Sequence, residues 1–160
     1  MAIEYSAEKT AADLDKAQVQ ELFDSVDWPH AQVPDDLMKA LAHSEVLITA
    51  WEDGKLIGLA NAVGDGTFHA YIHWLIVHAN AQRHGVGSRL LVKLLAKLEN
   101  RNQVFVFSDA RYASLWSRMG FVILSAETEE PGQAALIAGF RWHPIPGVHY
   151  ELDDADAEEE

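Results

Sequence analysis

The sequence predicts an α/β (α+β) fold, in which one mixed sheet and its flanking helices form a single domain. The chain has 160 residues, a length that suits one domain. Two apolar runs flank the turn Glu52-Asp53-Gly54, which is a hairpin pattern. A leucine-rich amphipathic segment at 85–99 follows a third apolar run, so the predicted helices and strands are interspersed along the chain.

Two helix patterns precede the strands. Residues 15–26 carry apolar side chains at helical spacing; Asp15 is a suitable N-cap, and Gln18 stands at the capping-box position. Pro29 and Pro34 interrupt the next segment, which we expect to be a loop. Residues 35–43 predict a short second helix.

Strand patterns then dominate. We expect the hairpin strands, a third strand from Thr67 to Val77 after the turn at 64–66, and the helix at 85–99. Shorter patterns predict a strand at 103–107, a helix at 112–119, a strand at 120–124 and a last strand at 134–142. The predicted order is α-α-β-β-β-α-β-α-β-β.

The composition narrows the class of protein. Hydrophobic residues make up 49% and charged residues 23%, as in a globular rather than a disordered chain. The chain has no cysteine, which excludes disulfides and thiolate chemistry. The formal net charge of −13 argues against nucleic-acid and membrane binding. No apolar run has the roughly 20 residues of a membrane span or resembles a signal peptide, so we expect a cytoplasmic protein.

The charge is unevenly distributed. Seven of the ten residues at 151–160 (ELDDADAEEE) are acidic and none is basic, and we expect them to be a disordered tail after a single domain at 1–150. Basic residues gather instead between 83 and 101. A local anion site and a solvated helix face are the two explanations.

One segment carries recognisable chemistry. Gln82-Arg83-His84-Gly85-Val86-Gly87 joins an apolar strand to the leucine-rich helix. The glycines leave no side chain between backbone and ligand, and the first helical turn offers free N–H groups at the positive end of the dipole. A phosphate group bound there needs no metal.

Three alternatives stay open on the motif alone. Two glycines before a helix can simply form a tight turn. A dinucleotide site needs a third glycine, where this chain has Leu90. The basic residues can serve only to solvate the helix.

The flanking residues support a family resemblance. Gln82-x-x-Gly85-x-Gly87 resembles the acyl-CoA-binding motif of the GNAT superfamily of N-acetyltransferases. Trp116-Ser-Arg-Met-Gly120-Phe121 resembles the family's Tyr-x-x-x-Gly-Phe segment, and residues 35–66 are similar to the N-terminal half of small bacterial members. The likeness covers about residues 3–142. It implies a GNAT-like, mostly antiparallel sheet with a bulged central strand.

The resemblance implies acetyl-CoA as co-substrate. Its pantetheine arm would pair with the main chain of Leu75, Ile76 and Val77, where the strand splays from its neighbour. Asp109 aligns with an asparagine that meets this arm in the family, but an ionised aspartate accepts hydrogen bonds and cannot donate them. The pyrophosphate would lie over Gln82, Arg83, His84, Gly85, Val86, Gly87 and Ser88.

The implied reaction is direct attack of an amine on the thioester in a ternary complex, with the Val77 N–H facing the developing oxyanion. Trp116 takes the place of the tyrosine that acts as general acid in many members, although an indole does not release a proton. Tyr112, a water or unassisted departure of the thiolate are the alternatives, and packing is the role that we favour for Trp116.

We select His73 as the general base, because an imidazole titrates near neutrality and this strand often carries a carboxylate in the family. Tyr71, a water chain and a purely structural histidine are the alternatives. If the strand is regular, Trp74 points to the opposite face of the sheet.

The sequence also leads to predictions about the acceptor, a metal and a partner subunit. Trp28 and His30 lie in the loop that covers the acceptor pocket in the family, and they join His73 as candidate substrate contacts, with core packing as the alternative. We expect no metal, since His69 and His73 would stand about 13 Å apart on a strand. The aromatic segment 140–150 wraps the sheet or meets a second subunit, in line with the dimers that are common in the family.

We therefore expect an N-acetyltransferase that moves an acetyl group from acetyl-CoA to a primary amine, more readily a small molecule than a protein. The alternative is a non-catalytic acyl-CoA-binding or sensing module, which the residues at positions 109 and 116 favour.

Overall fold

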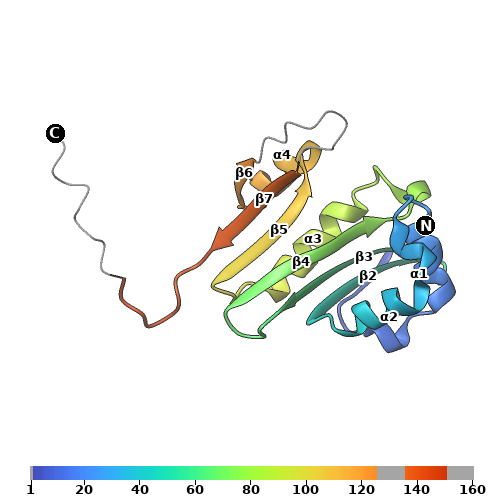
Figure 1. Cartoon of the computed structure of the whole chain (residues 1–160), viewed down its shortest axis with the longest axis horizontal. Coiled ribbons are helices and arrows are strands. Elements are labelled where there is room, and N and C mark those ends of the chain that lie inside the picture. The colour runs from blue at the N-terminus through green and yellow to red at the C-terminus, as the bar shows by residue number, and fades with distance from the viewer. Residues whose placement is uncertain (1, 126–135, 151–160) are drawn as a thin grey trace.

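The computed structural model describes residues 2–125 and 136–150 (Figure 1). The predicted acidic tail at 151–160 and the first two residues of the predicted last strand lie outside the described residues.

A seven-stranded sheet organises the domain, with the order β1-β2-β3-β4-β5-β7-β6. Neighbouring strands are antiparallel except for β4 and β5, which are parallel. The mixed, mostly antiparallel sheet confirms the predicted fold class. The strands are β1 (Glu4–Ser6), β2 (Val46–Glu52), β3 (Lys55–Gly64), β4 (His69–Val77), β5 (Gln103–Asp109), β6 (Val122–Ser125) and β7 (Leu136–Trp142).

Helices cover both faces of this sheet, as Figure 1 shows. One apolar core lies between the sheet and α3, and includes Ile72 and Leu90. A second core lies between the sheet and the pair α1–α2, and includes Phe23 and Trp74. The helices are α1 (Lys16–Asp24), α2 (Pro34–Ala42), α3 (Val86–Lys97) and α4 (Ala113–Arg118).

Helix α1 begins as its sequence predicts. Asp15 is the N-cap, and its carboxylate accepts the N–H of Gln18 at 3.1 Å. The Gln18 side chain does not complete a capping box; its Oε1 accepts the N–H of Leu56 at 2.8 Å. Gln18 therefore fastens α1 to β3.

Two differences from the predicted elements have local causes. Strand β1 was not predicted, because three residues at a sheet edge carry no readable alternation. Strand β4 begins at His69 rather than Thr67, because the Asp65 carboxylate accepts the N–H groups of Thr67, Phe68 and His69 at 2.7–3.1 Å and holds them in the turn. The predicted loop after α1 includes a 3₁₀ turn at Pro29–Gln32.

Strand β4 contains the bulge that the resemblance implied. Asn61 of β3 pairs with Trp74 and Ala62 with Ile72, so His73 is an extra residue on β4. In a regular strand, Ile72 and Trp74 would share a face of the sheet. The extra residue puts them on opposite faces, so Ile72 packs in the α3 core and Trp74 in the α1–α2 core. The regular strand assumed for Trp74 is wrong, and its ring stacks on that of His73 at 3.9 Å between centroids.

Close approach of α3 depends on a glycine in β3. A Cβ on Gly58 would lie 3.0 Å from both the Ile76 carbonyl oxygen and Leu90 Cδ1. The absence of a side chain at Gly58 lets the motif helix sit directly on β3 and β4.

Candidate functional site

The carboxyl-terminal half of β4 separates from β5. The parallel ladder between them runs from the pair His69–Gln103 to the pair Ile72–Val106. Beyond this point, Leu75, Ile76 and Val77 still pair with β3 on their other side. In the described part of the chain, no strand pairs with these three residues on the β5 side, so an extended ligand can add there as a strand.

The loop after β4 is held by its own polar groups. The Gln82 side-chain amide donates to the Val77 carbonyl at 3.1 Å, which ties the loop back to the end of the strand. His78 is buried, and its Nδ1 accepts the N–H of Asn80 at 3.1 Å. Gln82, predicted as a ligand contact, thus has a structural bond as well.

The loop then presents an open helix terminus. Gly85 is the N-cap of α3, with φ of +79°, and Arg83 also has a positive φ of +65°. Among residues 2–125 and 136–150, no side chain caps this terminus, and the first turn carries no acidic residue. The N–H groups of Val86, Gly87 and Ser88 therefore lack intrahelical partners and can bind an anion.

The space beside the terminus is open. A Cβ on Gly85 would meet nothing within 4 Å, and one on Gly87 would meet only Val77 Cγ2 at 3.6 Å. Arg83 and His84 are exposed beside it, whereas the Val86 side chain is buried and leaves only its main chain for a ligand. The residues present thus suit the phosphate end of a coenzyme A molecule.

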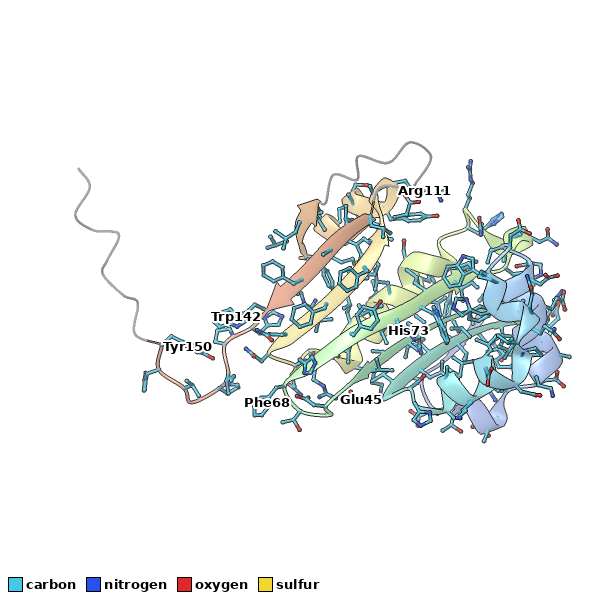
Figure 2. All side chains as sticks on the ribbon, viewed as in Figure 1. Glu45, Phe68, His73, Arg111, Trp142 and Tyr150 are labelled. Carbon is cyan, nitrogen blue, oxygen red and sulfur yellow. The ribbon has the colours of Figure 1, made fainter. Side chains whose placement is uncertain are left out.

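A ring cluster lies on the α1–α2 side of the bulge. The His30 ring is 5.5 Å from Trp74 and 6.2 Å from Trp28, between centroids. Trp74 in turn stacks on His73, which Figure 2 labels on β4. The structure therefore brings together Trp28, His30 and His73, the three candidate acceptor contacts.

Burial shifts the pKa values of His73 and of the neighbouring Tyr71. Desolvation lowers the pKa of His73 below its ordinary value of 6.5, and the charge of His30 lowers it further. Burial raises the pKa of the Tyr71 phenol, whose ring is 5.9 Å from that of His73. At neutral pH, His73 is a neutral imidazole that can accept a proton, and Tyr71 is a neutral phenol.

The remaining candidates lie near the end of β5. The Asp109 carboxylate accepts the N–H of Arg111 at 2.9 Å and pairs with its guanidinium at 3.1 Å, and these bonds hold the pKa of Asp109 below its usual range. Tyr112 is half-exposed beneath the Arg111 guanidinium. Trp116 is 3% exposed and packs edge-on against Phe121 at 5.2 Å. Burial in the core suits packing better than proton transfer.

Sequence reasoning missed Asn61. This fully buried residue sits opposite the bulge and hydrogen-bonds across it. Its signal was a lone amide in the otherwise apolar run LIGLANAV.

The described ranges hold neither a cluster of metal ligands nor a membrane-spanning helix. No group of three His, Asp or Glu side chains there lies close enough to hold a metal ion. No helix there has the length and apolar character to cross a membrane.

Comparison with known proteins gives concordant matches. The model of the acetyltransferase (GNAT) family matches residues 13–121. A serotonin N-acetyltransferase from Oryza sativa is 27% identical over 128 residues, covering 74% of this chain and 62% of that protein. A histone acetyltransferase from Glycine max is 28% identical over 148 residues, covering 84% of this chain and 60% of that protein. The chain thus spans about three-fifths of these curated relatives.

A solved structure shares the fold. An aminoglycoside 6'-N-acetyltransferase, complexed with coenzyme A, superposes with a TM-score of 0.67 at 16% identity, and the match covers 91% of this chain and 99% of the other.

Proposed function

The chain belongs to the GNAT family of acetyltransferases, and we propose that it moves an acetyl group from acetyl-CoA to a primary amine by direct attack in a ternary complex. The observation that carries this proposal is the uncapped first turn of α3 beside the open edge of β4. Acetyl-CoA has an anionic diphosphate, which suits the α3 terminus, and an amide-bearing pantetheine arm, which suits the open edge of β4.

Both main-chain and side-chain groups would bind acetyl-CoA. The diphosphate would accept hydrogen bonds from the N–H groups of Gly87 and Ser88, with Arg83 adding positive charge. The pantetheine amides would pair with the main chain of Leu75–Val77. The coenzyme A complex of the structural neighbour supports this choice of ligand.

The chemistry follows from the reacting atoms. The amine nitrogen forms a bond to the thioester carbonyl carbon, and the carbon–sulfur bond breaks with its electron pair on sulfur. A cationic amine first releases one proton to solvent, because only the neutral amine can attack; during the attack the nitrogen loses a second proton, which His73 accepts directly or through a water. The thiolate is a weak base and leaves as such or takes a proton from Tyr112 or a water.

The pKa of His73 supports its assignment as base. Its lowered value keeps the imidazole neutral at neutral pH, so the base is ready before the amine binds. Val77 remains our candidate for the main-chain donor to the carbonyl oxygen, as the resemblance implies.

The acceptor that we propose is a small cationic amine. The net charge of −13 attracts cations from solution. The relatives' names differ on this point, since one is a serotonin and another a histone acetyltransferase. A panel of arylalkylamines, polyamines and lysine peptides separates a small acceptor from a protein.

We further propose a homodimer, as the sequence suggested, and keep a cytoplasmic location as a prediction. Large apolar side chains are exposed on β5, β6, β7 and the segment after β7 (Figure 2). Burying such a surface against a second copy would release water from it. Sedimentation velocity measures the oligomeric state directly. The exposed apolar side chains of this surface are Phe107, Val122, Leu124, Leu136, Trp142, Val148 and Tyr150.

A non-catalytic acyl-CoA-binding module is the second candidate. The buried Trp116 and the ion-paired Asp109 favour it, since neither supplies the group that the family places there. Release of free thiol from acetyl-CoA, measured with the amine panel, decides between the two. Amine-dependent release supports the transferase; coenzyme binding without release supports the module; no binding contradicts both.

A further inference from the structure

We propose that Asn61 is a positioning residue, whose buried side-chain amide holds the β4 bulge and thereby aims the His73 imidazole. This inference rests on the proposed role of His73 as general base. It assigns a function to a residue outside the motif and on a different strand.

The bonds of Asn61 are specific to the bulge. Its Oδ1 accepts the main-chain N–H of Trp74 at 2.9 Å, immediately after the extra residue. Its Nδ2 donates to the Ser44 hydroxyl at 2.9 Å, in the turn that joins α2 to β2. Both ends of a fully buried amide are therefore satisfied, and the second bond fixes which way the amide points.

The first bond replaces part of the strand ladder. A bulge leaves one residue of the longer strand without its regular partner, so a main-chain N–H needs another acceptor. Asn61 supplies this acceptor from its side chain. An apolar residue at position 61 would leave the Trp74 N–H buried without an acceptor, a state that proteins avoid.

Two properties of the site depend on this bulge. The first is the orientation of His73, whose ring stacks on Trp74 at 3.9 Å with an angle of 21° between the planes. In a regular strand, the two side chains would point to opposite faces and could not stack. The second is the separation of β4 from β5, which starts at Ile72, the residue before the bulge.

The site itself gives Asn61 no other role. Its side chain is fully buried, so it contacts no substrate, and it acts only through Trp74 and its neighbour His73. The alternative is a purely structural residue that only supports the stability of the domain. The test therefore needs a control of equal burial on the same sheet.

Three variants and one control test the inference in the full chain. Asn61→Leu removes the acceptor while keeping the same number and branching of side-chain heavy atoms, and Asn61→Asp keeps an acceptor in place. Ser44→Ala removes only the bond that orients the amide. Thr49→Val is the control, because Thr49 is also fully buried on β2 and its hydroxyl accepts the Trp51 indole N–H at 2.8 Å.

Kinetics and NMR are measured together. We expect Asn61→Leu to lower kcat by about 100-fold with the acetyl-CoA KM within about threefold, as for a misplaced catalytic group. Asn61→Asp should regain part of kcat, Ser44→Ala should lose about fivefold, and Thr49→Val should keep kcat. The NMR signals of the Trp74 amide and the His73 ring should move in both Asn61→Leu and Ser44→Ala.

The outcomes separate the two proposals. Equal loss of kcat in Asn61→Leu and Thr49→Val, or unchanged His73 signals in every variant, overturns the positioning role. If Asn61→Leu does not fold, a wild-type kcat and unchanged spectrum for Ser44→Ala overturn it. Inactive wild type with every amine contradicts the proposed function alone, and the spectra still decide whether Asn61 holds His73.

Discussion

Replacing Gly85 by glutamate probes the open terminus of α3 most sharply, because the chain offers a matched control. Gly85 and Gly54 have nearly equal φ angles of +79° and +76°, and a Cβ on either would meet nothing within 4 Å. Gly54 lies in the turn between β2 and β3, outside the motif segment at 82–88. Gly85→Glu and Gly54→Glu therefore carry the same backbone strain and the same added charge.

The expected magnitudes follow from that match. Each substitution should cost about 1–2 kcal/mol of folding free energy, because an L side chain is strained in this left-handed region. Repulsion distinguishes them. A carboxylate about 5 Å from a doubly charged diphosphate costs about 1.7 kcal/mol even at the dielectric constant of water, so the Kd for coenzyme A should rise at least 15-fold, roughly, in Gly85→Glu only.

Titration calorimetry with coenzyme A measures the affinities, and thermal melts measure the shared strain. We expect both variants to melt a few degrees below wild type and only Gly85→Glu to lose affinity. Equal affinity in the two variants would refute the placement of the diphosphate at the α3 terminus.

Four other perturbations give equally direct tests. His73→Ala should lower kcat by about 100-fold or more with an unchanged acetyl-CoA KM. In wild type, kcat/KM should rise with pH through a pKa below 6.5, since only the neutral imidazole accepts a proton, and this step should be missing from the His73→Ala profile. Salt should weaken coenzyme A binding several-fold between about 0.1 and 1 M, where the Debye length shrinks from about 10 to 3 Å; a constant Kd would argue against an exposed ionic site. Gly58→Ala should destabilise the domain by about 1–3 kcal/mol in urea unfolding, because its Cβ would press on both the Ile76 carbonyl of β4 and the Leu90 side chain of α3, whereas a wild-type midpoint would mean that both neighbours can move away.

Elements with local signals were predictable from the sequence. Asp15 caps α1 through a bond to a residue three positions away, and the turn at Asp53 and Gly54 uses the positive φ that such residues tolerate. The leucine spacing of α3 and its glycine terminus are equally local. These features depend on neighbours in the sequence, so one chain is enough to read them.

The bulge at His73 was implied by the resemblance, but its position and consequences depend on contacts between distant segments. HAYIHWLIV shows no break in its pattern, because an extra residue in one strand is visible only against its partner. Asn61 and Ser44 are 17 positions apart, and their bond forms only when the turn before β2 lies against β3. The cluster of Trp28, His30 and Trp74 likewise needs the folded chain.

The measurement that bears most directly on the proposed site is an NMR titration of the isotope-labelled chain with coenzyme A. Our account places the largest amide shifts at Val86, Gly87 and Ser88, with a second group at Leu75–Val77 on the open edge of β4. If coenzyme A is added and neither segment shifts, either because the ligand binds elsewhere or because it does not bind, the result would contradict our account.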